Sequence, residues 1–200
     1  LNADFRPLSN VKCQPILGAD LVSEKPFLLH VGTNLARKNR RLLIDLVVKL
    51  GDRWTGDIVF AGKSMDEGLR SYAAQSGALA RIKEFPDVSH ETLVALYSSC
   101  AAFIFPSFSE GFGWPIIEAQ ACCAPVITSS VAPMPEIGGQ GALYADPKDP
   151  GQFAEQFLKL ESKTYRESLV QNGLKNVSRF SGDLMTNNYL NLIFSNSVKS

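Results

Sequence analysis

Residues 27–62 of this 200-residue chain read FLLHVGTNLARKNRRLLIDLVVKLGDRWTGDIVFAG. The stretch opens with a short apolar run that predicts a buried strand ending at Gly32. Leucine and valine then recur at helical spacing over 38–50, and a second apolar strand over 57–61 ends at Gly62. A strand, a helix and a strand in this order predict a right-handed βαβ unit with parallel strands.

The rest of the chain repeats this alternation. Further strands are expected at 82–85, 101–105, 125–128 and 142–144, and helices at 66–76, from Ser89 onward, at 114–123 and over most of 149–194. The fold class is therefore α/β, a Rossmann-like parallel sheet of about six strands with helices on both faces. Residues 1–25 are expected to be an irregular linker, because Pro7 and Pro15 interrupt them. We divide the remainder into a Rossmann-like domain, 26–180, and a C-terminal helix, 181–200.

Composition narrows the function classes. Hydrophobic residues make up 45% of the chain and the formal net charge is zero, which argues against a general nucleic-acid or anionic-membrane surface. No run approaches the roughly 20 apolar residues of a membrane span, and the N-terminus lacks the pattern of a signal peptide. We expect a cytoplasmic protein that could associate peripherally with the inner face of the membrane. Because residue 1 is Leu, we also expect the chain to be part of a longer protein.

The four cysteines do not form a C-x-x-C pair. Cys122 and Cys123 are adjacent in an apolar run, which favours buried thiols over a disulfide or a zinc site. The same expectation applies to Cys13 and Cys100, and it fits a reducing compartment. No metal or cofactor is predicted.

A basic cluster follows the first strand. Four of the five residues 37–41 are cationic and lie where the helix over 38–50 is expected to begin. Each exposed cation at the positive end of a helix dipole costs roughly 0.3–1 kcal/mol, so an anion is expected to compensate. A phosphate suits a helix N-terminus. The alternative is a solvated cluster that pairs with Asp45 or Glu67.

Residues 106–119 read PSFSEGFGWPIIEA and connect a strand to a helix. Gly111 and Gly113 allow a tight turn and the close approach of backbone N–H groups to a ligand. Pro115 suits the first helical turn. At the carboxyl end of a parallel strand, such a loop is expected to bind an anion or a sugar diphosphate.

Two carboxylates flank this loop. Glu110 could accept hydrogen bonds from the hydroxyls of one sugar, and Glu118, about one turn inside the helix, could take two vicinal hydroxyls of a ribose. Either carboxylate alone could instead be a charge that the helix dipole favours. His30 is expected in the core and His90 at a helix start, and neither has the partners of a catalytic triad.

The string EGFGWPIIEA at 110–119 resembles the Glu-seven-residues-Glu motif of family 4 of the retaining glycosyltransferases, which have the GT-B fold. Other segments that resemble this family are 2–7 at its interdomain linker, 31–33 with 37–39, 124–129 and 145–150. The resemblance covers nearly the whole chain. It implies the C-terminal, donor-binding half of such an enzyme, inactive alone.

The resemblance implies a role for each site residue. Arg37 and Lys38 would contact the donor diphosphate, Glu110 would hold the transferred sugar, and Glu118 would bind the ribose. We expect Glu110, Lys38 and Arg37 to be the catalytic residues, with cations and backbone amides stabilising the departing diphosphate. The resemblance also implies retention by same-face attack. The remaining donor-binding residues would be Gly32, Thr33, Lys63, Phe85, Gly111, Phe112 and Gly113.

This chain departs from the family pattern at two positions. Many relatives carry Arg where this chain has Thr33, and the turn that contains Lys63 lacks a second glycine. Arg37 could replace the missing charge, and Lys63 could reach a phosphate or remain solvated.

The expected function is transfer of a hexose from a nucleotide diphosphate sugar to a glycan or lipid-linked acceptor, which the N-terminal half would bind. The V-G-T…R-K-N form is similar to that of mannosyltransferases of polysaccharide assembly, which favours GDP-mannose as the donor. The alternatives are a nucleotide-sugar epimerase of the same fold, a non-catalytic nucleotide-sugar-binding module, and an unrelated flavodoxin-like domain.

Overall fold

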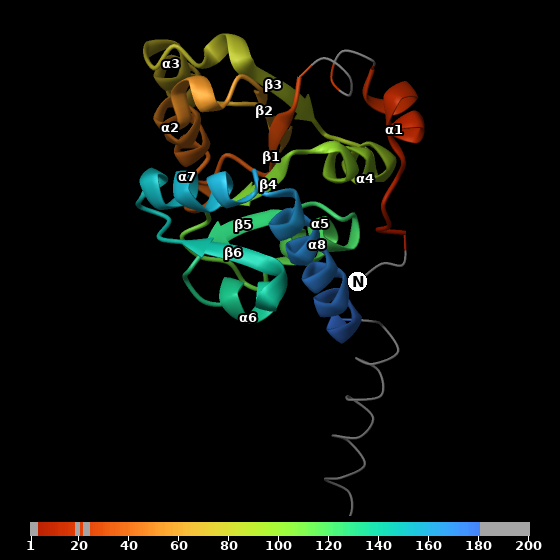
Figure 1. Ribbon diagram of the computed structural model, residues 1–200. Helices are drawn as coiled ribbons and strands as arrows, with labels where there is room; N and C mark the ends of the chain where they lie inside the picture. Colours follow the sequence, from red (N-terminus) through yellow and green to blue (C-terminus); the bar gives the residue numbers. More distant parts are fainter. Residues whose placement is uncertain (1–3, 19–20, 22–24, 181–200) are drawn as a thin grey trace, which may run out of the picture.

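The computed structural model describes residues 4–18, 21 and 25–180. The predicted C-terminal helix over 181–200 and the first two residues of the linker segment 2–7 lie outside the described residues. Six parallel strands form one sheet, as predicted (Figure 1). They are β1 (Phe27–Gly32), β2 (Asp57–Gly62), β3 (Ile82–Pro86), β4 (Ala102–Phe105), β5 (Val126–Ser129) and β6 (Ala142–Ala145).

The strand order is β3-β2-β1-β4-β5-β6, so the direction of winding reverses between β1 and β4. Ligands of doubly wound sheets bind outside the carboxyl ends of the strands at such a reversal. The fold therefore directs attention to the two loops that follow Gly32 and Phe105, the last residues of β1 and β4.

Helices cover both faces of the sheet (Figure 1). One face carries α2 (Arg41–Leu50), α3 (Glu67–Gln75) and α7 (Pro150–Lys159), and the other carries α1 (Asn10–Leu17), α4 (His90–Ser99) and α5 (Trp114–Ala121). Helix α8 (Lys163–Val177) packs against α5 and contributes Leu169 to the core of the first face. A short helix, α6 (Met134–Gly138), follows β5. Within β1, Phe27 and Leu29 pack into one core and Leu28 into the other, which is the two-residue alternation of a strand.

The prediction of an irregular segment over 1–25 is wrong, because residues 10–17 form α1. Helix α1 packs against α4 and buries Cys13 and Leu17, and this burial outweighs the hydrogen bond that Pro15 cannot donate.

Helix α2 begins later than the predicted Lys38. Residues 36–38 form a separate 3-10 turn, Asn39 has a left-handed backbone with φ 51°, and α2 starts at Arg41. Arg37 and Lys38 therefore do not lie in the first turn of a long helix.

The cysteines are free thiols as predicted. Cys13, Cys100 and Cys122 are buried, and Cys123 is half-buried. Burial raises the pKa of Cys122 to about 12, so this thiol is protonated at neutral pH.

Within the described part of the chain, no helix combines the length and the apolar character needed to cross a lipid bilayer.

Candidate functional site

The loops that follow β1 and β4 are tied together at the reversal of the sheet. The backbone N–H of Phe108 donates to the carbonyl of Arg37 at 2.8 Å, and the Arg37 guanidinium donates to the carbonyl of Ser109 at 3.1 Å. The amide of Asn39 donates to the carbonyl of Pro106 at 3.2 Å. These bonds hold 36–39 beside 106–110.

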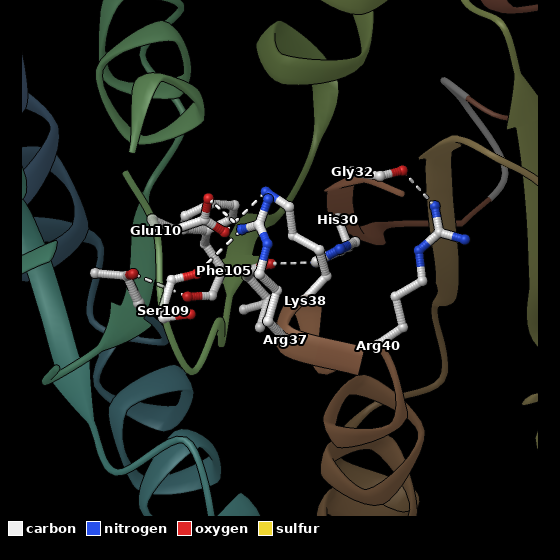
Figure 2. Close-up of polar contacts among 10 residues, drawn as sticks. His30, Gly32, Arg37, Lys38, Arg40, Phe105, Ser109 and Glu110 are labelled. Atoms are coloured by element: carbon white, nitrogen blue, oxygen red, sulfur yellow. Dashed lines mark hydrogen bonds and ion pairs between the residues drawn. The ribbon is translucent and has the colours of Figure 1, made fainter. Parts of the chain in front are cut away.

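Glu110 lies between two cations in this arrangement (Figure 2). Its carboxylate is 2.7 Å from a guanidinium nitrogen of Arg37 and 2.8 Å from Nζ of Lys38. The Glu110 and Lys38 side chains are only 8% and 10% exposed, whereas Arg37 is 41% exposed. Arg37 and Lys38 thus pair with Glu110, and neither expected partner, Asp45 or Glu67, contacts them.

The charge state of Glu110 follows from these contacts. Burial would raise the pKa of its carboxyl, but hydrogen bonds from Lys38 and Arg37 outweigh burial and hold the pKa below its ordinary value. Glu110 is therefore ionised at neutral pH, and the site contains two cations around one carboxylate.

The other two cations of the basic cluster have structural partners. Arg40 is buried and donates to the carbonyls of Gly32 at 2.7 Å and Lys63 at 2.6 Å, which joins the loops after β1 and β2. The Arg41 guanidinium lies 3.7 Å from the centre of the Tyr72 ring. These contacts position the loops. They leave Arg37 and Lys38 as the cations at the switch point of the sheet, where the direction of winding reverses.

The glycine-rich loop leads into α5 as expected. Gly113 occupies the N-cap position with a left-handed φ of 102°, and Pro115 lies in the first turn. The ring of Phe112 packs against Trp114 with 4.6 Å between centroids, and against Phe180 at 5.9 Å. The first N–H groups of a helix lack partners within it, so the end of α5 beside Glu110 can bind an anion.

Glu118 lies on α5 and has a partner that sequence reasoning missed. The hydroxyl of Tyr97, on α4, donates a 3.1 Å hydrogen bond to Oε2 of Glu118. Burial raises the pKa of Glu118, against the opposing effect of this hydrogen bond. No spacing in the sequence relates Tyr97 to Glu118, because only the packing of α4 against α5 brings them together.

His30 lies in the core, as predicted. Its side chain is fully buried, stacks on Phe105 and lies 3.1 Å, through Nδ1, from the carbonyl of Ile104. Since a carbonyl only accepts hydrogen bonds, Nδ1 carries the proton. Burial, then the charges of Arg40 and Lys38, lower the pKa of His30 to about 3. The ring is therefore neutral.

The remaining predicted residues lie at the same edge of the sheet but not at the Glu110 cluster. Thr33 is exposed after β1, and Phe85 is half-buried near the end of β3. Lys63 forms an exposed ion pair with Asp87 at 2.9 Å. The sequence had suggested a lysine that is solvated or binds a phosphate. Among the described residues, no three His, Cys, Asp or Glu side chains are grouped as a metal site.

Sequence comparison identifies relatives of this chain. The family model "Glycosyl transferases group 1" matches residues 19–176. O-antigen chain mannosyltransferase B of Escherichia coli is 30% identical over 195 residues, which cover 95% of this chain and 51% of that protein. O-antigen chain mannosyltransferase RfbU of Salmonella typhimurium is 29% identical, over 72% of this chain and 41% of that protein. The chain thus spans about half the length of these relatives or less.

Solved structures share the fold. A structure of HepE from Anabaena in complex with UDP and glucose superposes with a TM-score of 0.81 at 17% identity, over 96% of this chain and 54% of HepE. Sucrose-phosphate synthase from Thermosynechococcus elongatus gives a TM-score of 0.79 at 23% identity, over 96% of this chain and 50% of the synthase. The similarity extends over the whole sheet and both helical layers. Because the family model matches most of the chain, the chain belongs to the group 1 glycosyl transferases.

Proposed function

We propose that this chain is the donor-binding domain of a retaining hexosyltransferase that uses a nucleotide diphosphate sugar. The observation that carries the proposal is the convergence of Arg37 and Lys38 on Glu110 at the switch point of the sheet. Cations can bind a diphosphate, and a carboxylate can accept hydrogen bonds from the hydroxyls of a sugar. Both kinds of side chain lie side by side here.

The proposed roles follow from charge. During transfer, negative charge grows on the departing diphosphate while positive charge grows on the sugar ring. Arg37, Lys38 and the backbone amides of 111–113, just before α5, would stabilise the phosphate charge, and Glu110 would orient the sugar and face the cationic ring. Glu118 would bind the vicinal hydroxyls of the ribose, while Gly32, Thr33, Lys63 and Phe85 would border the rest of the nucleotide.

We propose mannose as the transferred sugar and GDP-mannose as the donor. This proposal is supported by the two O-antigen mannosyltransferases among the relatives. The glycan or lipid-linked acceptor would be bound by a domain equivalent to the part of the relatives that this chain does not match. A cytoplasmic location, at the inner face of the membrane, stays a prediction.

The proposal is tested by calorimetric titration of the chain with GDP, UDP, ADP, GDP-mannose and UDP-glucose. We expect GDP-mannose to bind most tightly, and Glu118→Ala to weaken binding of both GDP and GDP-mannose about tenfold or more. Glu161→Gln is the matched control, because Glu161 pairs with the exposed Arg53 away from the site.

The alternative outcomes separate the parts of the proposal. Binding of UDP-glucose in place of GDP-mannose would keep the donor-binding role and overturn the choice of sugar. Binding of none of the five ligands to the folded chain would overturn the donor-binding role itself.

A further inference from the structure

His30 presents an unsatisfied acceptor to the site. Its Nδ1–H is occupied by the carbonyl of Ile104, and its fully buried Nε2 has no hydrogen-bond partner among the described residues. Buried polar atoms are normally paired, so an orphan acceptor next to a functional cluster requires an explanation. An apolar residue of similar size would fill the same space without leaving an acceptor unpaired.

The unpaired nitrogen and the aliphatic part of the Lys38 side chain both border Gly32. A Cβ atom built on Gly32 would lie 3.3 Å from Nε2 of His30 and 3.3 Å from Cδ of Lys38. A side chain at position 32 would therefore press on both the histidine ring and the lysine side chain. Nζ of Lys38 lies 4.8 Å from the centre of the Phe105 ring, on which His30 also stacks.

Arg40 is the other cation beside His30 (Figure 2). Its terminal nitrogens already donate to the carbonyls of Gly32 and Lys63. The terminal ammonium of Lys38, in contrast, has three N–H donors, and its described ion pair is with Glu110. Nε of Arg40 is also buried without a partner among the described residues, but of the two cations only Lys38 also pairs with Glu110.

We propose that His30 is a positioning residue for Lys38, supplying through Nε2 an uncharged acceptor that holds the ammonium in place when a donor diphosphate draws it from Glu110. This inference rests on the proposed function, since it assumes that Lys38 binds the diphosphate. A neutral acceptor suits this task because it fixes the ammonium without cancelling the charge that the phosphate needs. A carboxylate at the same place would neutralise it.

The proximity of Nε2 of His30 to the Lys38 side chain is tested without any ligand. In the chain labelled with ¹⁵N-histidine, the spectrum contains only two rings, and exposed His90 is the internal reference. We expect Nε2 of His30 to be unprotonated at neutral pH, and its resonance to move further in Lys38→Met than in Arg40→Lys. A protonated Nε2, no movement in Lys38→Met, or a larger movement in Arg40→Lys would overturn the proposal.

The positioning role is tested by titration of His30 variants with GDP-mannose, GDP and UDP. His30→Gln keeps an acceptor near the Nε2 position, whereas His30→Phe keeps a ring and removes the acceptor. We expect His30→Gln to bind within about threefold of the parent and His30→Phe to bind about tenfold more weakly. A role in packing alone would give the opposite order, because a phenyl ring preserves the stacking on Phe105.

A double-mutant cycle decides whether His30 acts through Lys38. We expect His30→Phe to have no further effect on binding in the Lys38→Met background. An equal loss in both backgrounds would overturn the proposal, and thermal unfolding of each variant establishes that it is folded. If the parent chain binds no nucleotide, the proposed function fails, whereas the NMR comparison still decides whether His30 contacts Lys38.

Discussion

Tyr97 and Glu118 come from different helices, and the buried phenol of Tyr97 donates a 3.1 Å hydrogen bond to Oε2 of Glu118. One oxygen of the carboxylate is thereby fixed by the protein, which leaves the other oxygen to accept from a ligand. A carboxylate held in one rotamer loses less conformational freedom on binding two hydroxyls than a free side chain does. The pair is therefore a preorganised acceptor at the proposed ribose position.

Tyr97→Phe should weaken nucleotide binding without removing a charge. The variant deletes a single hydroxyl, so we expect the dissociation constant of GDP to rise about three- to tenfold and the unfolding free energy to fall by about 1 kcal/mol. Calorimetry and urea unfolding measure the two effects. Unchanged GDP affinity in Tyr97→Phe, with Glu118→Ala still impaired, would show that the hydroxyl does not orient the carboxylate.

The affinity for nucleotide should fall at acidic pH because of Glu118. Burial holds its pKa above the ordinary value, so the carboxyl takes up a proton at a pH where an exposed glutamate is ionised. Protonation removes acceptor capacity, and binding should weaken as the pH falls through this raised pKa. Titrations between about pH 5 and pH 7 measure the effect, and Glu118→Gln should flatten the dependence.

Glu118 and Glu110 should change the pH dependence of the unfolding free energy in opposite directions. The raised pKa of Glu118 means that the folded chain binds this proton more tightly than the unfolded chain, so its contribution to stability grows as the pH falls. The lowered pKa of Glu110 gives a contribution that is present above its unfolded pKa and is lost as the pH falls through the folded pKa. Urea unfolding of Glu118→Gln and Glu110→Gln across acidic pH should separate the two.

Glu110→Gln should destabilise the fold, because it leaves the buried ammonium of Lys38 beside Arg37 without their shared anion. We expect a loss of about 3 kcal/mol in the unfolding free energy. Added pyrophosphate should raise the unfolding midpoint of the variant more than that of the parent, because the anion can take the vacated place. Glu161→Gln breaks an exposed pair and should cost about 1 kcal/mol or less. Equal losses in the two variants would contradict the buried-pair argument.

Gly62→Ala should disrupt the backbone contact between the ends of β1 and β2. Gly62 has φ 120°, and a Cβ there would lie 2.2 Å from the carbonyl oxygen of Gly32, which also accepts from Arg40. We expect a loss of about 2–4 kcal/mol in urea unfolding. Gly51→Ala is the control, since φ is 54° there but no atom lies within 4 Å of the added Cβ. It should cost about 1 kcal/mol.

Much of the fold could be predicted because most of its strands are short apolar runs, of which β1 and β2 end at a glycine and β4 is followed by a proline. Ser89 is an example at the level of a single residue, since its hydroxyl accepts from the backbone N–H of Thr92 and caps α4 as its sequence position predicts. Helix α1 could not be predicted, because Pro15 is locally unfavourable and only packing against α4 favours the helix.

The loops that carry the candidate site could be predicted from the sequence, whereas the contacts between them could not. The loops after β1 and β4 could be singled out, because a parallel sheet brings the carboxyl ends of its strands to one edge. Which charges pair across those loops depends on the strand order, and periodicity does not specify that β1 lies next to β4. Pairing of Lys38 with Glu110, and of Tyr97 with Glu118, therefore emerged only with the structure.

The Glu110 carboxylate, held between Arg37 and Lys38, is a counter-ion that the chain itself supplies to these two cations. An incoming phosphate has to displace a competitor that is tethered to the chain and cannot be diluted away. A bare nucleotide leaves the displaced carboxylate without a partner, whereas a nucleotide that carries a sugar offers it hydroxyl groups. Selection for sugar-bearing nucleotides over bare ones would thus be built into the domain before any ligand arrives.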